Sequence, residues 1–153
     1  MKKCTLALGC FWKPEENFKN KVGIIKTEVG YAGGKNPIVT YKEVCKGNTG
    51  HAEVVRLSYD EKIISFRKIL DLFFKMHDPT TLNRQGPDIG TQYRSEIFCL
   101  DDDQYLIADG IKRNFNKEVY DDKIVTSISM ADNFWIAEEY HQKYVRKKKN
   151  MIF

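Results

Sequence analysis

Cys10 is the residue of this chain whose surroundings most clearly favour chemistry. It lies in Gly9-Cys10-Phe11-Trp12, after a short apolar run, and the following Lys13-Pro14-Glu15 is typical of a helix start. Proline is well tolerated in a first helical turn, and acidic residues there complement the helix dipole. A thiol at such a helix terminus has a lowered pKa, so we expect Cys10 to be a nucleophile. The alternative is a small buried hydrophobe.

The two aromatic residues that follow Cys10 indicate what the thiol would act on. Phe11 and Trp12 place two rings beside the sulfur. A reactive thiolate next to aromatic rings makes a site for an apolar group that carries an atom open to attack.

Glu53 is a second candidate, because it lies on the apolar face of a predicted strand over residues 51–59. Side chains alternate along a strand, so Glu53 shares its face with Val55 and Leu57. Burial of a carboxylate is costly unless it is hydrogen-bonded or protonated, and it raises the pKa, which suits a general acid. The alternative is a structural salt bridge, to Arg94 or Arg84.

Two loops complete the candidate site. The turn at residues 47–50 is expected to aim the start of the Glu53 strand at Cys10. The segment from Pro79 to Arg94 contains two prolines, two glycines and almost no apolar periodicity. Long irregular loops are often functional, so we interpret it as a site wall with Asp88 and Tyr93 as hydrogen-bonding groups; an ordinary surface loop is the alternative.

Composition indicates a soluble globular protein. The chain has 153 residues, 42% hydrophobic and 30% charged, with a net charge of +4. Much of the excess charge lies in residues 146–149, which we interpret as a solvated tail. The four cysteines include no C-x-x-C pair, so we expect no metal site and a reducing, cytoplasmic environment. No segment approaches transmembrane length, so we expect no membrane segment.

Periodicity and turn residues predict the elements that must position these groups. Strands are expected at residues 2–9, 22–31, 51–59, 94–100 and 124–128, and helices at 11–20, 65–77, 101–116 and 137–148, with one helical turn at 40–45. Strict strand–helix alternation is absent, so we predict one α+β domain over residues 1–153, with helices packed against a sheet.

In this order the segments resemble the peptide methionine sulfoxide reductase A family. The matching motifs are Gly9–Trp12, Gly30–Gly34, Tyr41–Cys45, Thr49–Val55, His77–Thr80, Asn83–Gly86, Asp88, Gly90, Gln92–Ser95 and Ala137–Gln142. The resemblance covers nearly the whole chain. It implies a two-layer α+β sandwich with a mixed sheet and a ferredoxin-like core, acting on the S epimer of methionine sulfoxide to repair oxidised proteins.

The resemblance implies a role for each candidate. Cys10 attacks the sulfoxide sulfur and becomes a sulfenic acid, while Glu53 protonates the oxygen. The other positions bind the substrate: Tyr41 and Tyr93 hydrogen-bond the oxygen, Asp88 holds the polar wall, and Phe11 and Trp12 enclose the methyl group. A sulfoxide oxygen leaves poorly unless it is protonated or strongly hydrogen-bonded, so an acid and two phenols suit the task. His51 and His77 are assigned structural hydrogen bonds.

The chain departs from the family at its C-terminal end. Many members carry recycling cysteines after the Tyr-His-Gln segment, but no cysteine follows Cys99 here. The remaining reductants are glutathione with glutaredoxin, thioredoxin, or an internal thiol from Cys4, Cys45 or Cys99. Because Cys45 and Cys99 resemble buried core positions, we expect a single-cysteine enzyme without a bound cofactor, recycled by an external thiol.

Three other functions remain open from the sequence alone. Another thiol enzyme, such as a peroxidase or a thiol–disulfide oxidoreductase, would use Cys10 but leave Glu53 without a task. A metal-binding module is disfavoured by the ligand spacing. A nucleic-acid-binding protein is disfavoured because basic residues with interleaved aromatics are lacking outside the tail.

Overall fold

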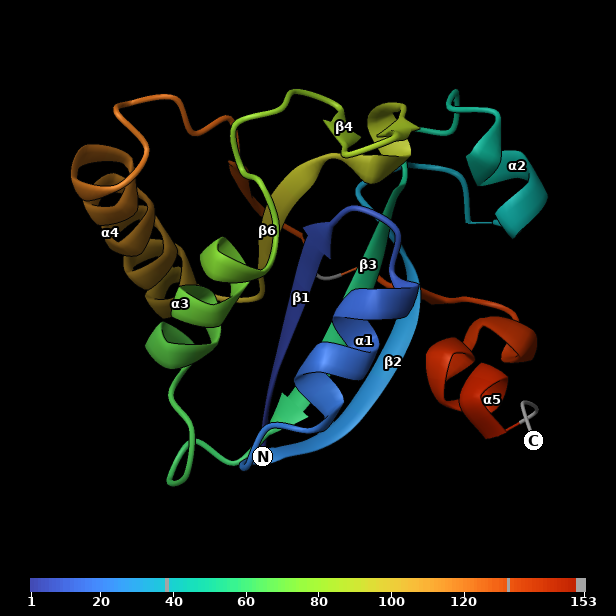
Figure 1. Cartoon of the computed structure of the whole chain (residues 1–153), viewed down its shortest axis with the longest axis horizontal. Helices are drawn as coiled ribbons and strands as arrows, with labels where there is room; N and C mark the ends of the chain where they lie inside the picture. The colour runs from blue at the N-terminus through green and yellow to red at the C-terminus, as the bar shows by residue number, and fades with distance from the viewer. Residues whose placement is uncertain (38, 132, 151–153) are drawn as a thin grey trace.

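The computed structural model describes residues 1–37, 39–131 and 133–150. Its centre is a mixed sheet in the order β7-β6-β1-β3-β2-β8 (Figure 1). The strands are β1 (Lys2–Leu8), β2 (Ile24–Ala32), β3 (Ala52–Tyr59), β6 (Ser95–Cys99), β7 (Ser127–Met130) and β8 (Trp135–Ile136). Neighbouring strands are antiparallel except β6 and β7, which are parallel. A separate ribbon pairs β4 (Arg84–Gln85) with β5 (Asp88–Ile89).

The helices complete the two-layer arrangement that the sequence predicts. They are α1 (Trp12–Lys19), α2 (Tyr41–Cys45), α3 (Phe66–Met76), α4 (Asp102–Glu118) and α5 (Tyr144–Asn150), with short 3-10 turns η1 (Thr91–Tyr93) and η2 (Glu139–His141). The order β1-α1-β2-β3-α3-β6, with β6-β1-β3-β2 side by side, is the split βαβ pattern of a ferredoxin-like core. The predicted fold is therefore confirmed.

Side-chain caps fix where three helices begin. Ser65 accepts a hydrogen bond from the Lys68 N–H at 3.0 Å, and Asp101 accepts one from the Gln104 N–H at 2.8 Å. Thr40 caps the short helix α2 through the Glu43 N–H at 3.2 Å. Each cap satisfies an N–H group that the helix itself leaves unpaired.

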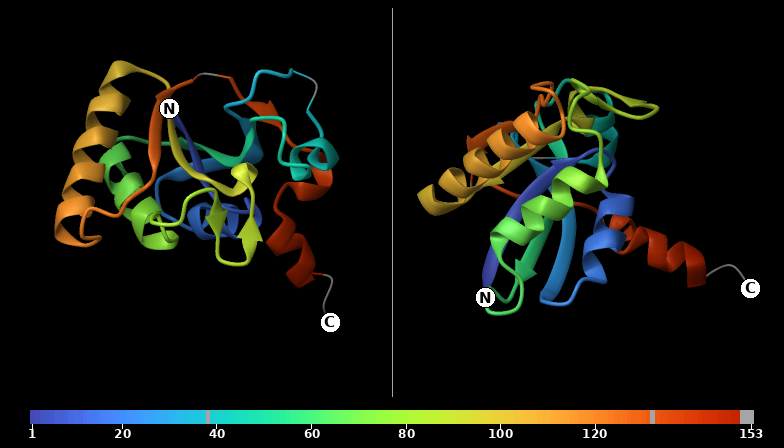
Figure 2. Two further views of the ribbon diagram at one scale, coloured as in Figure 1. Left: turned by 90° about the horizontal axis from the view of Figure 1, so that it is seen from above. Right: turned by 60° about the vertical axis from the view of Figure 1, so that its left-hand side comes forward.

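One face of the sheet carries the main core. Leu6, Val55 and Leu57 point from β1 and β3 toward α1 and α3, where they meet apolar side chains such as Phe18 and Phe73. Figure 2 shows α1 and α3 on this same side of the sheet. The apolar residues on the other face form a smaller cluster around Ala7, Val54 and Phe98. Residues that point toward α1 from β3 are thus enclosed between sheet and helices.

The C-terminal region differs most from the sequence prediction. The helix expected over 137–148 is interrupted, because η2 is followed by Lys143 with φ at +56° and only then by α5. The Gln142 side chain is committed to backbone groups of Val29 and Ala137, and the Lys143 N–H donates to Glu15. These tertiary bonds replace the bonds of a continuous helix. The last predicted strand, at 124–128, also lies later, at Ser127–Met130.

Several short elements were not predicted from the sequence. The irregular segment between Pro79 and Arg94 contains the β4–β5 ribbon and η1, and β8 adds an edge strand beside β2. Among the helices that the structure describes, none is both long and apolar enough to cross a membrane.

Candidate active site

Gly9 turns the chain so that Cys10 stands at the entrance to α1. Its φ is +93°, a value that side-chain-bearing residues rarely adopt, and a Cβ here would lie 2.9 Å from Gln85. Cys10 follows as a partly exposed residue between the end of β1 and Trp12, the first residue of α1. The Trp12 N–H is hydrogen-bonded to the Cys10 sulfur, so the thiol does meet the predicted helix terminus.

The expected lowering of the Cys10 pKa is nevertheless wrong. Burial raises the pKa of the thiol to about 12, and the hydrogen bond from the Trp12 N–H counteracts this only in part. The carboxylates of Glu53 and Asp88 raise it further, since they disfavour a nearby negative charge. The resting site therefore holds a protonated Cys10 thiol.

Glu53 occupies the buried position that strand alternation predicts. It lies on β3 with only 1% of its surface exposed, on the face it shares with Val55 and Leu57. Its Oε1 accepts a hydrogen bond from the Phe11 N–H at 3.2 Å, and its Oε2 is buried without a hydrogen-bond partner among the described residues. Burial raises the pKa of Glu53 to about 8, despite the Phe11 N–H. The carboxyl is thus mainly protonated at neutral pH.

The salt-bridge alternative for Glu53 is not found. The Arg94 guanidinium instead binds Glu96, with Nε at 2.7 Å from Oε1. Arg84 donates to the Gly86 carbonyl at 2.9 Å within its own ribbon. Neither arginine therefore balances the charge of Glu53, which leaves protonation as the way to lower the cost of burying the carboxyl.

Aromatic rings from three parts of the chain gather beside Cys10. The Phe11 ring is buried, with 1% exposed, and lies 5.8 Å from the Tyr31 ring and 6.4 Å from the Tyr41 ring. The Trp12 ring is partly exposed and lies 6.4 Å from Tyr41. Phe11 thus forms a floor, and Trp12 and Tyr41 stand above it as the accessible part of an apolar surface.

Tyr41, Tyr93 and Asp88 reach the same place from different elements. Tyr41 begins α2, Tyr93 ends η1 and Asp88 lies on β5. Burial raises the pKa of Tyr93 to about 12, and the negative charges of Glu53, Asp88 and Cys10 add to the rise. Burial likewise raises the pKa of Tyr41, to which Glu53 and Tyr93 contribute. Both phenols keep their protons, and the Tyr41 hydroxyl is hydrogen-bonded to the Cys45 side chain.

A recess of about 220 Å³ opens beside the Cys10 sulfur. Asp88 and His77 lie on its wall, together with Lys13 and Gln85. The aromatic rings of Trp12 and Tyr41 are not part of its lining. Cys10 therefore lines a recess with mixed polar and apolar walls that is separate from the aromatic surface of Trp12 and Tyr41.

Sequence reasoning missed two residues that hold the aromatic wall in place. Glu138 accepts hydrogen bonds from the Tyr31 hydroxyl at 2.9 Å and from the Tyr41 N–H at 3.0 Å. His141, 1% exposed, accepts the Trp12 indole N–H on Nδ1 at 2.9 Å, and its ring lies 4.2 Å from that of Tyr41. The only available signal was their place in the Ala137–Gln142 motif.

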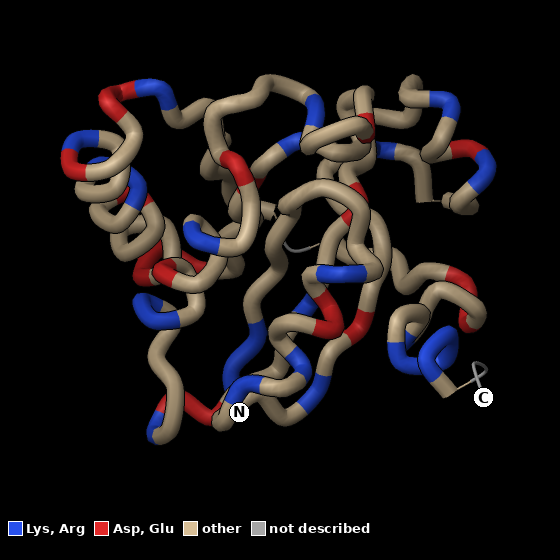
Figure 3. The backbone as a smooth tube through the Cα atoms, viewed as in Figure 1, with Lys and Arg blue, Asp and Glu red and all other residues tan. Residues whose placement is uncertain are grey.

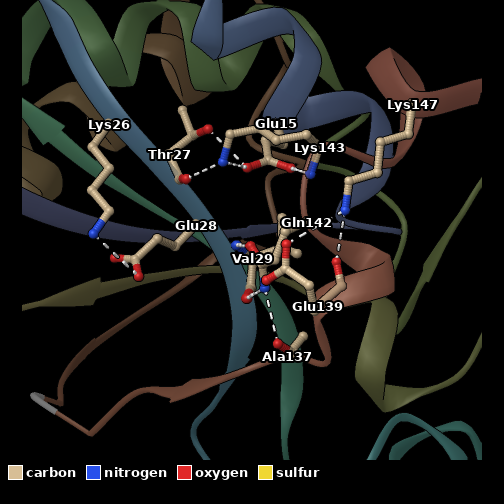
Figure 4. Close-up of polar contacts among 10 residues, drawn as sticks. All are labelled: Glu15, Lys26, Thr27, Glu28, Val29, Ala137, Glu139, Gln142, Lys143 and Lys147. Atoms are coloured by element: carbon tan, nitrogen blue, oxygen red, sulfur yellow. Dashed lines mark hydrogen bonds and ion pairs between the residues drawn. The ribbon is translucent and has the colours of Figure 1, made fainter. Parts of the chain in front are cut away.

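The C-terminal segment is anchored by buried polar contacts, as Figure 4 shows. Gln142 donates and accepts hydrogen bonds with the Val29 backbone, both at 2.9 Å. The buried Glu15 carboxylate accepts from the Lys143 N–H at 2.7 Å, the Lys143 ammonium at 2.9 Å and the Thr27 hydroxyl at 2.8 Å. These bonds fix the segment that carries Glu138 and His141. Figure 3 shows the basic residues of α5 beyond it.

The two histidines assigned structural roles do make internal hydrogen bonds. His51 Nδ1 accepts the Gly34 N–H at 3.1 Å, and its Nε2 lies 2.9 Å from the Asn36 carbonyl. His77 lies 2.7 Å from the Phe73 carbonyl and 2.8 Å from the Ser95 hydroxyl, and burial lowers its pKa to about 4. In the described part of the chain, no three His, Cys, Asp or Glu residues are grouped to hold a metal.

The remaining cysteines differ from the prediction at one position. Cys4 and Cys99 are each 1% exposed and lie in the main core. Cys45, which was expected to be buried, is an exposed free thiol. The side chain of its neighbour Val44 takes the buried position on α2, and Cys45 is left exposed to solvent.

Comparison with known proteins places the chain in a family. A model described as peptide methionine sulfoxide reductase matches residues 2–152. The peptide methionine sulfoxide reductase MsrA of Pelagibacter ubique is 56% identical, over 97% of this chain and 100% of that protein.

Solved structures give the same result. Mxr1 from Saccharomyces cerevisiae in reduced form has a TM-score of 0.92 at 44% identity, covering 97% of this chain and 86% of that one. A structure of Mxr1 in complex with Trx2 has a TM-score of 0.66 at 30% identity, covering 94% and 84% of the two chains. With its thiol, buried acid and aromatic wall in the matched region, this chain belongs to the peptide methionine sulfoxide reductase family.

Proposed function

We propose that this enzyme reduces methionine-S-sulfoxide, free and in proteins, by transferring the sulfoxide oxygen to Cys10. The substrate sulfur is reduced to a thioether, and Cys10 is oxidised from thiol to sulfenic acid. The thiol proton ends on the transferred oxygen, so atoms and electrons balance. Repair of oxidised methionine in proteins follows from this reaction.

The observation that carries the proposal is the buried Glu53 carboxyl joined to the backbone next to Cys10. With a pKa of about 8 it is mainly protonated at neutral pH, and its Oε2 has no hydrogen-bond partner among the described residues. A protonated carboxyl can donate to the sulfoxide oxygen, which makes that oxygen a better leaving group. A peroxidase or a disulfide oxidoreductase would not need this acid.

The protonated resting thiol fits the same sequence of events. Cys10 keeps its proton while the site is empty, chiefly because burial disfavours the thiolate. As its sulfur bonds to the substrate sulfur, the thiol proton is released and Glu53 delivers one to the oxygen. Cys10 and Glu53 together thus release one proton and deliver one, and no net charge is left in the buried site.

Substrate binding follows from the groups around the pair. Tyr41 and Tyr93 donate hydrogen bonds to the sulfoxide oxygen, and Asp88 shapes the polar wall. The methyl group on sulfur packs on the Trp12 ring above the Phe11 floor, since thioether and sulfoxide sulfurs pack well on aromatic rings. This division separates the polar oxygen from the apolar methyl group and would distinguish the two epimers.

An external dithiol of the thioredoxin type returns Cys10 to the thiol. The complex of Mxr1 with Trx2 supports this choice over glutathione with glutaredoxin, which remains the alternative. The four free thiols suit a reducing compartment such as the cytoplasm. No bound cofactor is required by the reaction.

Single-turnover reduction of the two sulfoxide epimers, without reductant, tests this function. The expected product is methionine from the S epimer, in an amount that does not exceed that of the enzyme. Cys10→Ser should abolish it, and Glu53→Gln should slow it by about 10²- to 10⁴-fold. The surface variant Glu43→Gln is the matched control. Equal use of both epimers, or faster turnover of hydrogen peroxide, would contradict the proposal.

A further inference from the structure

The basic segment near the C-terminus, which the sequence predicts to be a solvated tail, forms helix α5 and packs beside the candidate site. The Tyr144 ring, at the start of α5, stacks on the Trp12 ring with 3.9 Å between the centroids and 13° between the planes. One helical turn further on, the exposed Lys148 ammonium lies 6.0 Å from the Tyr144 ring centroid. Two short steps therefore lead from the Trp12 ring to a cation in solvent.

Internal contacts fix the position of α5 relative to the site. The Arg146 guanidinium lies 3.3 Å from the Glu16 carboxylate on α1. The Lys147 ammonium donates to the Glu139 carbonyl of η2 at 2.9 Å. These contacts tie α5 to the elements before and beside Trp12, so the charges at its exposed end keep a defined distance from the site.

Two lysines at this end, Lys148 and Lys149, keep their charge toward solvent; we call them the α5 lysine pair. In the part of the chain that the structure describes, Lys148 forms no ion pair with a carboxylate. The Lys149 ammonium is 3.9 Å from the Glu16 carboxylate, which Arg146 approaches more closely, and 67% of its side chain is exposed. An exposed pair at this distance contributes little, so both cations are available to a partner.

We propose that the α5 lysine pair binds acidic residues that flank the oxidised methionine of a protein substrate. The enzyme would then prefer methionine sulfoxide in acidic segments. The inference rests on the proposed function, because it concerns the substrate of the same site. Charge complementarity supports an acidic partner, and the stacking of Tyr144 on Trp12 supports a polypeptide whose neighbouring residue occupies the site. An anionic membrane or RNA would need no such relation to Trp12.

The distances indicate where the acidic residue must lie in the substrate. An extended chain advances about 3.3 Å per residue, so two to four residues cover the path from the Trp12 ring past Tyr144 to Lys148. An acidic residue eight positions away lies roughly 26 Å from the oxidised methionine. That is well beyond the Debye length of about 8 Å at physiological ionic strength, so it should have little effect.

Single-turnover reduction of peptides, without reductant and well below saturation, tests this preference without involving the thiol donor. The peptides carry methionine-S-sulfoxide with Glu, Gln or Lys two to four positions away on both sides, or with Glu only eight positions away. At low ionic strength the near-Glu peptide should react about five- to tenfold faster than the Gln peptide. The distant-Glu peptide should match the Gln peptide. High salt should remove the difference.

Charge reversal gives the sharper readout. Lys148→Glu with Lys149→Glu should reverse the preference, so that the Lys peptide reacts faster than the Glu peptide. Lys148→Gln with Lys149→Gln should abolish the preference without reversing it. The matched control is Lys112→Glu with Lys117→Glu on α4, a helix on the opposite side of the molecule from α5 (Figure 1). This control should keep the wild-type preference, and all of these proteins should reduce free methionine-S-sulfoxide at the same rate.

The outcomes separate this inference from the proposed function. Equal rates with the Glu and Gln peptides, together with normal reduction of free methionine-S-sulfoxide, overturn the inference and leave the reductase assignment intact. Absence of methionine from every substrate overturns both. A reversed pair that raises KM for thioredoxin but keeps the peptide preference also overturns the inference, as does binding to phosphatidylserine vesicles or RNA without any peptide preference.

Discussion

The Phe11 N–H donates a 3.2 Å hydrogen bond to Glu53 across 42 positions of the sequence. The bond ties the backbone next to the nucleophile to the proposed acid, and it uses only one carboxyl oxygen. The second oxygen, Oε2, is thereby left for the substrate. Because the bond joins the carboxyl to the backbone, the distance between Glu53 and Cys10 is set by β3 and the β1–α1 turn.

The rate of the reduction step should depend on pH through Glu53. Burial raises its pKa to about 8, and we assign the protonated form as the active one. The single-turnover rate should therefore be highest below about pH 7 and fall about tenfold per pH unit above pH 8. Stopped-flow measurement of methionine formation from pH 5 to 9.5 checks this. A rate that rises through pH 8 in parallel with Cys10 ionisation would show that the acid is not needed.

The folding stability of the protein should also depend on pH through Glu53, and it should fall as the pH rises. The Glu53 pKa is higher in the folded state than its ordinary value of 4.5, so between these values the folded chain binds more protons than the unfolded chain. The contribution of this group to stability is then fully present below about pH 4.5 and is lost as pH rises to about 8. Glu53→Gln cannot ionise, so the difference in Tm, variant minus wild type, should increase over this range. A constant difference would contradict the buried acid.

His141 should act by holding Trp12 rather than by touching the substrate. In His141→Ala the partly buried indole N–H loses its acceptor, and a hydrogen bond of this kind contributes about 0.5–1.5 kcal/mol. We expect KM for the sulfoxide to rise about tenfold, with a smaller change in the rate of Cys10 alkylation by iodoacetamide. His141→Asn, which keeps an acceptor, should recover part of the loss. A fall in the rate of Cys10 alkylation as large as the rise in KM would indicate general misfolding instead.

The Glu15–Lys143 contact should be a major determinant of stability. Glu15 is 1% exposed and accepts hydrogen bonds from Lys143 and Thr27. The Lys143 side chain is 35% exposed and can be solvated once its partner is gone, so the loss is that of hydrogen bonds to a buried charge. Glu15→Ala should therefore lower the free energy of unfolding by about 1.5–3 kcal/mol. Asp71→Ala breaks the exposed pair with Lys75 and should cost less than about 1 kcal/mol. Urea denaturation of both variants gives the comparison.

Local patterns in the sequence were sufficient to predict the elements that carry Cys10 and Glu53. The alternation in β3 correctly places Glu53 with Val55 and Leu57, and the proline and acids after Cys10 correctly place the start of α1. Both depend on periodicity or on residues in one helical turn. The order of the motifs was also sufficient to identify the family.

Features that depend on contacts between distant segments were not predictable in this way. The Cys10 pKa follows from burial and from Glu53 and Asp88, which no local rule brings together. The break before α5 follows from Glu15, which binds Lys143 from 128 positions away. Cys45 was wrongly placed in the core because the direction of a five-residue helix depends on where it docks.

The anchoring of Glu138 and His141 near the end of the chain has a consequence for when activity first appears during synthesis. A nascent polypeptide that stops before Ala137 already contains Cys10 and Glu53, but it lacks the partners of the Tyr41 N–H and the Trp12 indole. Repair of oxidised methionine should therefore begin only after the segment that carries Glu138 and His141 has left the ribosome and docked. Proteolytic cleavage before Ala137 in an aged molecule should inactivate it while its nucleophile is still present.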